Sequence, residues 1–134
     1  MEKRTERRLL QFAVALACVV PLTAGTAGVV QGPAMAADDA VRHSVDLESH
    51  FRYLSGLLLG LGVGFAASIP RIERHRELFA ALSAAVVIGG LARLSHLLIH
   101  GTPAAPHVLA LGMELGVVPL LFAWQRRVAA LFGK

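Results

Sequence analysis

Four long apolar runs constrain the fold of this chain more than any other feature of its sequence. They cover residues 9–30, 51–69, 78–99 and 108–124. A helix needs about 20 apolar residues, and no fewer than about 17, to cross the hydrocarbon core of a bilayer. Every run meets this length, although the last only just does. We therefore predict an all-α integral membrane protein in which residues 1–134 form a single four-helix bundle.

The composition agrees with a membrane location. Hydrophobic residues make up 55% of the chain and charged residues 16%, and the mean hydropathy is +0.61. A water-soluble domain of this size needs more charge to cover its surface. The net charge of +4 does not indicate a nucleic-acid partner, because the basic residues stand in short clusters without interleaved aromatic residues. We expect the lipid bilayer to be the main partner, and the lone Cys18 excludes an internal disulfide.

The distribution of lysine and arginine predicts how the helices are oriented. Cytoplasmic segments of membrane proteins carry an excess of these residues. Most of them precede the first run, lie in the 70–77 connection or follow the last run: Lys3, Arg4, Arg7, Arg8, Arg71, Arg74, Arg76, Arg126, Arg127 and Lys134. Only Arg42 and Arg52 lie in or beside the 31–50 connection, and the 100–107 connection has none. We predict that both termini are cytoplasmic and that the protein resides in a bacterial cytoplasmic (inner) membrane.

The first run has an alternative interpretation as a secretory signal. The basic "MEKRTERR" is followed by "LLQFAVALACVV" and then by "AMAADDA", which resembles a cleavage site after Ala36. Cleavage would remove residues 1–36 and leave three spans. The apolar stretch is longer than the usual core of a signal, and "GTAGVVQGP" separates it from the site. We therefore favour a retained membrane helix.

A charged residue interrupts the third run, in the segment "IGGLARLSHLLIH" (residues 88–100). Arg93 lies seven residues before His100, which places it about 10 Å below the end of the helix. Glu114 lies seven residues after His107 and so reaches the same depth from the same side. A lone arginine near the middle of a membrane costs on the order of 3 kcal/mol. Because the short connection makes these two helices neighbours, we predict an Arg93–Glu114 ion pair.

Other polar residues are expected near this pair. Gly89, Arg93, His96 and His100 share one helical face because they are spaced by four, three and four residues. Arg52 and Tyr53 lie at the outer end of the second run. We predict a polar cluster around a pocket open to the outside, formed by Arg93, Glu114, His96, Arg52, Tyr53 and His100. The cluster either binds a ligand or has a structural role, in which the ion pair only fixes which helices pack together. A metal site is not favoured, because the spacing of His96 and His100 fixes no third ligand.

Three glycines in the second run predict a surface for helix packing. Gly56, Gly60 and Gly64 are four residues apart in "SGLLLGLGVG". Small residues at this spacing allow a second helix to approach closely, either within the bundle or in a homodimer. Pro21 and Pro119 lie inside the first and fourth runs, where each removes a backbone hydrogen bond and is expected to kink its helix.

The chain resembles a family of bacterial four-helix membrane proteins known as domain of unknown function 4345. The resemblance rests on "DLESHFRYLSGLLLGLG", "IPRIERH", "GGLARL" and "MELGVVPLLFAWQRRVA", in that order. It covers most of the chain and points to Arg52, Tyr53, Arg93 and Glu114. It implies an architecture but no reaction. More remotely, the chain is similar to the DoxX-like small membrane proteins, some of which accompany quinone-linked oxidoreductases, and this likeness concerns the fold alone.

Three classes of function fit these patterns. The first is a non-enzymatic accessory protein, with or without a membrane partner subunit, that binds a lipid or quinone-like molecule. The sequence favours this class because it lacks the motifs of nucleophilic catalysis and of phosphate-binding loops. The second is a membrane subunit of a quinone-linked oxidoreductase. The third, a proton-coupled transporter, would need titratable groups in the inner half of the spans, where the sequence has almost none.

Overall fold

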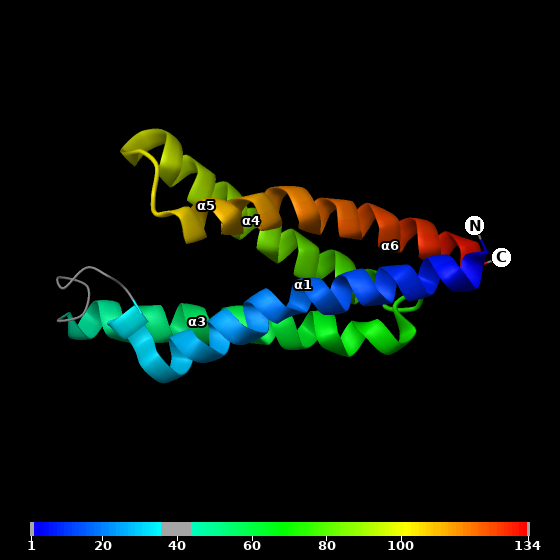
Figure 1. Cartoon of the computed structure of the whole chain (residues 1–134), viewed down its shortest axis with the longest axis horizontal. Helices are drawn as coiled ribbons and strands as arrows, with labels where there is room; N and C mark the ends of the chain where they lie inside the picture. The colour runs from blue at the N-terminus through cyan, green and yellow to red at the C-terminus, as the bar shows by residue number, and fades with distance from the viewer. Residues whose placement is uncertain (1, 36–43, 134) are drawn as a thin grey trace. The chain divides into compact units, whose positions relative to one another are not determined.

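The computed structural model describes residues 2–35 and 44–133, and every regular element within them is helical (Figure 1). Helix α1 (Lys3–Gln31) ends in the 3₁₀ turn η1 (Gly32–Met35), and α3 (Val45–Ser68) ends in the 3₁₀ turn η2 (Ile69–Arg71). Helix α4 (Arg76–His100) follows. The last segment consists of α5 (Ala105–Gly112), the π-helical turn η3 (Met113–Val117) and α6 (Val118–Phe132). Ala36, the site of the alternative cleavage, lies outside the described residues.

The four predicted apolar helices are confirmed. Lys3–Gln31, Val45–Arg71, Arg76–His100 and Ala105–Phe132 are each long and apolar enough to cross a membrane. No more than 22% of the most apolar stretch of any of them is buried. A water-soluble protein would bury such surfaces, whereas hydrocarbon solvates them. The exposed apolar side chains are therefore those of a multi-pass membrane protein.

The helices begin earlier than the apolar runs. Helix α3 starts at Val45, six residues before the second run, because Ser44 caps it: the Ser44 hydroxyl accepts a hydrogen bond from the Leu47 N–H at 3.3 Å. Asp46 and Glu48 occupy its first turn, where carboxylates interact favourably with the positive end of the helix dipole. Capping and charge thus set this helix start, and hydropathy alone does not locate it.

The described chain divides into two compact units, Met1–Ala13 with Ser68–Lys134 and Val14–Ala67. In the second unit, α1 and α3 pack antiparallel through glycines. A Cβ at Gly25 would lie 2.7 Å from the Leu59 backbone nitrogen, one at Gly28 would overlap the Ser55 hydroxyl, and one at Gly62 would lie 3.1 Å from Leu22. The absence of these side chains is what allows the two backbones to approach.

The predicted glycine face is not the one that makes this close contact. A Cβ at Gly60 would meet nothing within 4 Å, and one at Gly56 would meet only Val29, at an ordinary 3.9 Å. Gly62, which makes the contact, lies on the side of α3 away from Gly60. The alternative role of Gly56, Gly60 and Gly64, in a homodimer, stays a prediction.

In the first unit, α4 packs against α5, η3 and α6. The turn that precedes α4 is fixed by two glutamine side chains. Gln11 of α1 donates a hydrogen bond to the Ile69 carbonyl at 2.7 Å, and the buried Gln125 of α6 donates one to the Ile72 carbonyl at 2.8 Å. Backbone carbonyls in a turn need such donors when no water reaches them.

The two terminal segments also meet in this unit. Glu6 and Arg127 form an ion pair with 2.6 Å between Oε1 and Nε. Arg7 pairs with Glu73 at 3.4 Å. Because Glu6 and Arg127 come from opposite ends of the chain, the N-terminal and C-terminal helical segments lie at the same end of this unit (Figure 1).

The two prolines have different surroundings. Pro21 lies inside the uninterrupted α1. Pro119 is the second residue of α6. The residue between it and η3 is Val118, whose N–H donates to the Met113 carbonyl, one residue beyond the α-helical partner. A proline has no N–H for the carbonyl four residues before it, so the backbone near Pro119 departs from α-helical bonding. The predicted irregularity at Pro119 takes the form of this π-helical turn.

Candidate polar site within the apolar helices

The structure contains the predicted ion pair between Arg93 and Glu114. The contact is bidentate: Arg93 Nε donates to Glu114 Oε2 at 3.0 Å and Arg93 Nη2 donates to Oε1 at 3.1 Å. A planar guanidinium and a carboxylate match in this geometry, which fixes the orientation of both side chains. The positions of the two residues along antiparallel helices therefore predicted their contact correctly.

A glycine and the π-helical turn bring the two charges together. A Cβ at Gly90 would lie 2.8 Å from the Glu114 Cβ and 2.9 Å from Leu115 Cδ2, so only glycine permits this approach of α4 to η3. Glu114 itself lies within η3, and π-helical turns are frequent at functional sites. Helical spacing put Gly89 of this "GG" pair on the face of Arg93, but it is Gly90 that contacts the partner segment.

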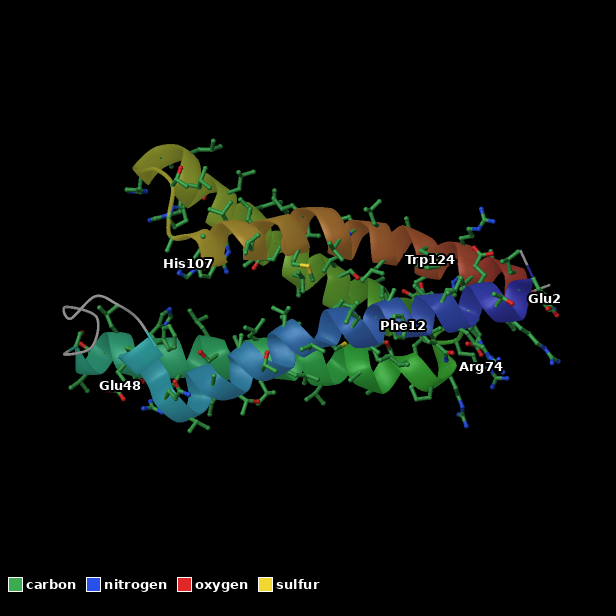
Figure 2. The ribbon with its side chains drawn as sticks, viewed as in Figure 1. Glu2, Phe12, Glu48, Arg74, His107 and Trp124 are labelled. Carbon is green, nitrogen blue, oxygen red and sulfur yellow. The ribbon has the colours of Figure 1, made fainter. Side chains whose placement is uncertain are left out.

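His107 joins the pair. Its Nδ1 lies 3.1 Å from Arg93 Nη1, and because a guanidinium nitrogen only donates, the imidazole Nδ1 must be the acceptor. The sequence placed His107 two turns from Glu114 on the same face, and that spacing was the signal for its role. Figure 2 shows His107 at the start of the last helical segment, with Trp124 farther along it.

His96 and His100 do not share these contacts. Their rings stack on each other, with centroids 4.6 Å apart and an angle of 20° between the planes, and both residues are exposed. Among the described residues, no three His, Cys, Asp or Glu side chains form a group that would hold a metal ion. His43 lies outside that part of the chain.

Arg52 has a different role in the second unit. Its Nη1 donates to the carbonyls of Val29 and Val30 at the end of α1, while Nε and Nη2 donate to Glu48 Oε1 at 3.1 and 2.9 Å. Gly32 lies beneath the guanidinium with a φ of 59° and ends α1. Arg52 thus caps a helix whose last carbonyls lack backbone partners.

Tyr53, next to Arg52, is exposed. Arg52 and Tyr53 belong to one unit, and the other residues of the predicted cluster belong to the other: Arg93, Glu114, His96 and His100. A single pocket that gathers both groups stays a prediction.

The Arg93–Glu114 pair is only partly covered by protein. The Arg93 side chain is 34% exposed and the Glu114 side chain 20% exposed. Opposite charges in this contact leave the pair neutral overall, and the guanidinium has more N–H donors than its three contacts use. The arrangement can therefore donate hydrogen bonds to an additional acceptor at the surface of the apolar helices.

Two hollows in the first unit lie away from Arg93. One, of about 240 Å³, is lined mainly by apolar residues of α4 and α6: Ala80, Ser83, Ala84, Val87, Pro119 and Phe122. The Ser83 hydroxyl there is buried and makes no hydrogen bond. The other lies at the end of the unit where the terminal segments meet.

Comparison with known proteins places the chain in a family. Residues 9–125 match the family model described as Domain of unknown function (DUF4345), so the chain belongs to this family. The match covers all four candidate membrane helices in whole or in large part, together with Arg93 and Glu114. None of the curated proteins and none of the solved structures compared with the chain matches it. The more remote likeness to the DoxX-like proteins stays a prediction.

Proposed function

Starting from this family membership, we propose that the protein is a non-enzymatic component of a bacterial cytoplasmic membrane that binds a lipid-soluble molecule with a carbonyl headgroup. The observation that carries the proposal is the partly exposed Arg93–Glu114 pair, held in a fixed geometry inside apolar helices. A charged pair at this depth is expensive to maintain, and such residues are commonly functional in membrane proteins.

The charge of the cluster favours one class of headgroup. Glu114 neutralises Arg93 and would repel a phosphate or carboxylate placed beside it. An uncharged carbonyl oxygen, as in a quinone, accepts a hydrogen bond from the unused guanidinium N–H groups without adding charge. The apolar surface around the Arg93–Glu114 pair would contact the hydrophobic part of such a molecule. Leu97, one turn after Arg93 on the same face of α4, is partly exposed and belongs to this surface.

The proposed orientation has both termini in the cytoplasm. The clustering of basic residues supports it, as does the meeting of Glu6 with Arg127 at one end of the first unit. A fluorescent protein fused after Lys134 should fold and fluoresce, because it would remain in the cytoplasm. If a reporter fused after Lys134 were active only when it is of a type that works outside the cytoplasm, this orientation would be contradicted.

A purely structural role for the ion pair is the second candidate function. The tight contact at Gly90 favours it, because a buried pair can fix which segments pack together. In that case the pair would hold α4 against η3 and bind no ligand.

Ligand titration of a charge-swapped variant separates the two roles. The wild type and the Arg93→Glu/Glu114→Arg double variant would be titrated with a short-tailed quinone and examined by native mass spectrometry. We expect both proteins to fold, since the pair is preserved, but only the wild type to bind, since the guanidinium has moved to the other helix. Quinone binding by neither protein, or equal binding by both, would contradict the proposal and leave the structural role.

A further inference from the structure

A hollow of about 350 Å³ lies at the end of the first unit opposite to the Arg93 cluster along α4. Its lining comes from the turn before α4 and from the end of α6: Glu73, Arg74, Arg76, Ala129, Phe132 and Gly133. Figure 2 shows Arg74 toward the same end of this unit as Glu2. The hollow therefore lies where apolar helices end and basic residues begin, which is the depth of lipid headgroups.

Cations surround this hollow. Arg74 and Arg76 are exposed, and no carboxylate of the described residues forms an ion pair with either of them. Lys3 is a further cation beside the hollow, since its Nζ lies 5.4 Å from the ring centroid of Phe132. Arg7 Cζ lies 5.3 Å from the same ring, but its charge is shared with Glu73. Such contacts with an aromatic ring keep the long side chains near the hollow.

Two acidic residues nearby are paired, and a third, the exposed Glu77 in the first turn of α4, does not line the hollow. Glu73 lines the hollow but forms an ion pair with Arg7 at 3.4 Å, and Glu6 forms one with Arg127. The carbonyls at the end of α6 oppose an anion, whereas the start of α4 favours one, since no side chain caps its N–H groups. With the two helix ends opposed, the side-chain cations decide the sign, and the hollow attracts anions.

We propose that this hollow binds the phosphate of an anionic phospholipid, with Arg74 and Arg76 contacting the phosphate and Ala129 and Phe132 contacting the glycerol and upper acyl chains. Basic pockets between membrane helices bind anionic headgroups in this way. The apolar half of the lining favours a lipid over free phosphate, which has no apolar part. This site is separate from the Arg93 cluster and does not depend on the function proposed for it.

Lipid titration in neutral detergent micelles tests the site, because a micelle has no charged surface to attract cations from a distance. Native mass spectrometry would measure binding of phosphatidylglycerol and phosphatidylcholine to the wild type, to Arg74→Gln/Arg76→Gln and to Arg4→Gln/Arg8→Gln. The control pair removes the same charge from exposed residues at the same end that do not line the hollow. We expect the lining variant to bind phosphatidylglycerol at least about tenfold more weakly, and the control to stay near the wild type.

The outcomes separate a built site from general attraction. Equal losses in the two variants, or equal affinity of the wild type for phosphatidylcholine, would overturn the proposal. Displacement of the lipid by millimolar inorganic phosphate would assign the hollow to free phosphate and would also overturn it. If the double variant does not fold, Arg74→Gln compared with Arg4→Gln gives the same test at single exposed side chains.

Discussion

Two arginines hold two pairs of helical segments in this protein, and they do so in different ways. In the second unit, Arg52 of α3 donates hydrogen bonds to the last carbonyls of α1 and also pairs with Glu48 of its own helix. In the first unit, Arg93 of α4 pairs with the carboxylate of Glu114 in the neighbouring turn η3. The carbonyls at a helix end lack backbone partners, but those inside a helix are already bonded. An arginine at a helix end can therefore donate hydrogen bonds to free backbone carbonyls. An arginine deep in the apolar run needs a carboxylate side chain as its partner.

The backbones approach closely in both units, but by different routes. The α1–α3 pair relies on Gly25, Gly28 and Gly62, while α4 and η3 rely on Gly90 and the ion pair. Helices in lipid gain little from burying apolar surface, because lipid tails are equally apolar. Close backbone contact and polar bonds provide the attraction that remains.

The largest difference between the two regions should appear when each loses its carboxylate. Glu114→Ala leaves Arg93 without a counter-ion in hydrocarbon, and we expect it to lower the free energy of unfolding by about 3 kcal/mol. Glu48→Ala removes the partner of a more exposed pair, with Arg52 39% and Glu48 42% exposed, and should cost less than about 1 kcal/mol. Unfolding by denaturant in a fixed detergent would measure both, and similar losses would refute the distinction.

Glycine substitutions test which face of α3 packs. Gly25→Ala would force a Cβ to within 2.7 Å of the Leu59 backbone, and we expect a loss of about 2 kcal/mol. Gly60→Ala meets nothing within 4 Å and should be neutral or stabilising by up to about 1 kcal/mol, because alanine favours helices. Thermal unfolding followed by circular dichroism compares them. A loss at Gly60 as large as that at Gly25 would show that the packing face is wrongly assigned.

A smaller loss than that of Glu114→Ala or Gly25→Ala is expected at the helix cap. Arg52→Ala should lower stability by about 1 kcal/mol, because the carbonyls of Val29 and Val30 lie near a helix end and are able to bond water instead. Arg52→Lys keeps the charge near these carbonyls and should recover much of the loss. Hydrogen exchange at the end of α1 provides the measurement. Unchanged exchange in Arg52→Ala would mean that the guanidinium does not cap this helix.

The sequence predicts the features that are set within a single helix better than those that depend on contacts between helices. Hydropathy located the four helices, and the fixed rise of a helix placed Arg93 and Glu114 at one depth, so both were accessible from the sequence. The glycine contacts were not, because the spacing of Gly56, Gly60 and Gly64 describes one helix, while the close contact depends on Gly25 and Gly28 of another. The turn η3 was also missed, since Pro119 predicts a lost hydrogen bond but not the form of the irregularity.

The early start of α3 and the role of Arg52 share one cause. Both depend on helix ends, at Ser44 and at Val29–Val30, and helix ends are fixed by a few local hydrogen bonds. An apolar run indicates where a helix crosses the membrane, but it does not show where the helix stops. The position of Arg52 near the start of the second apolar run was readable from the sequence, while its bonding partners required the structure.

Mutual neutralisation of Arg93 and Glu114 stabilises the fold, and a double-mutant cycle measures this coupling. Unfolding free energies would be measured for the wild type, Arg93→Ala, Glu114→Ala and the double variant. We predict that the double variant loses less than the sum of the single losses, with a coupling energy of at least about 2 kcal/mol, because each single change leaves an unpaired charge. Additive losses would show that the two side chains act independently and do not neutralise each other.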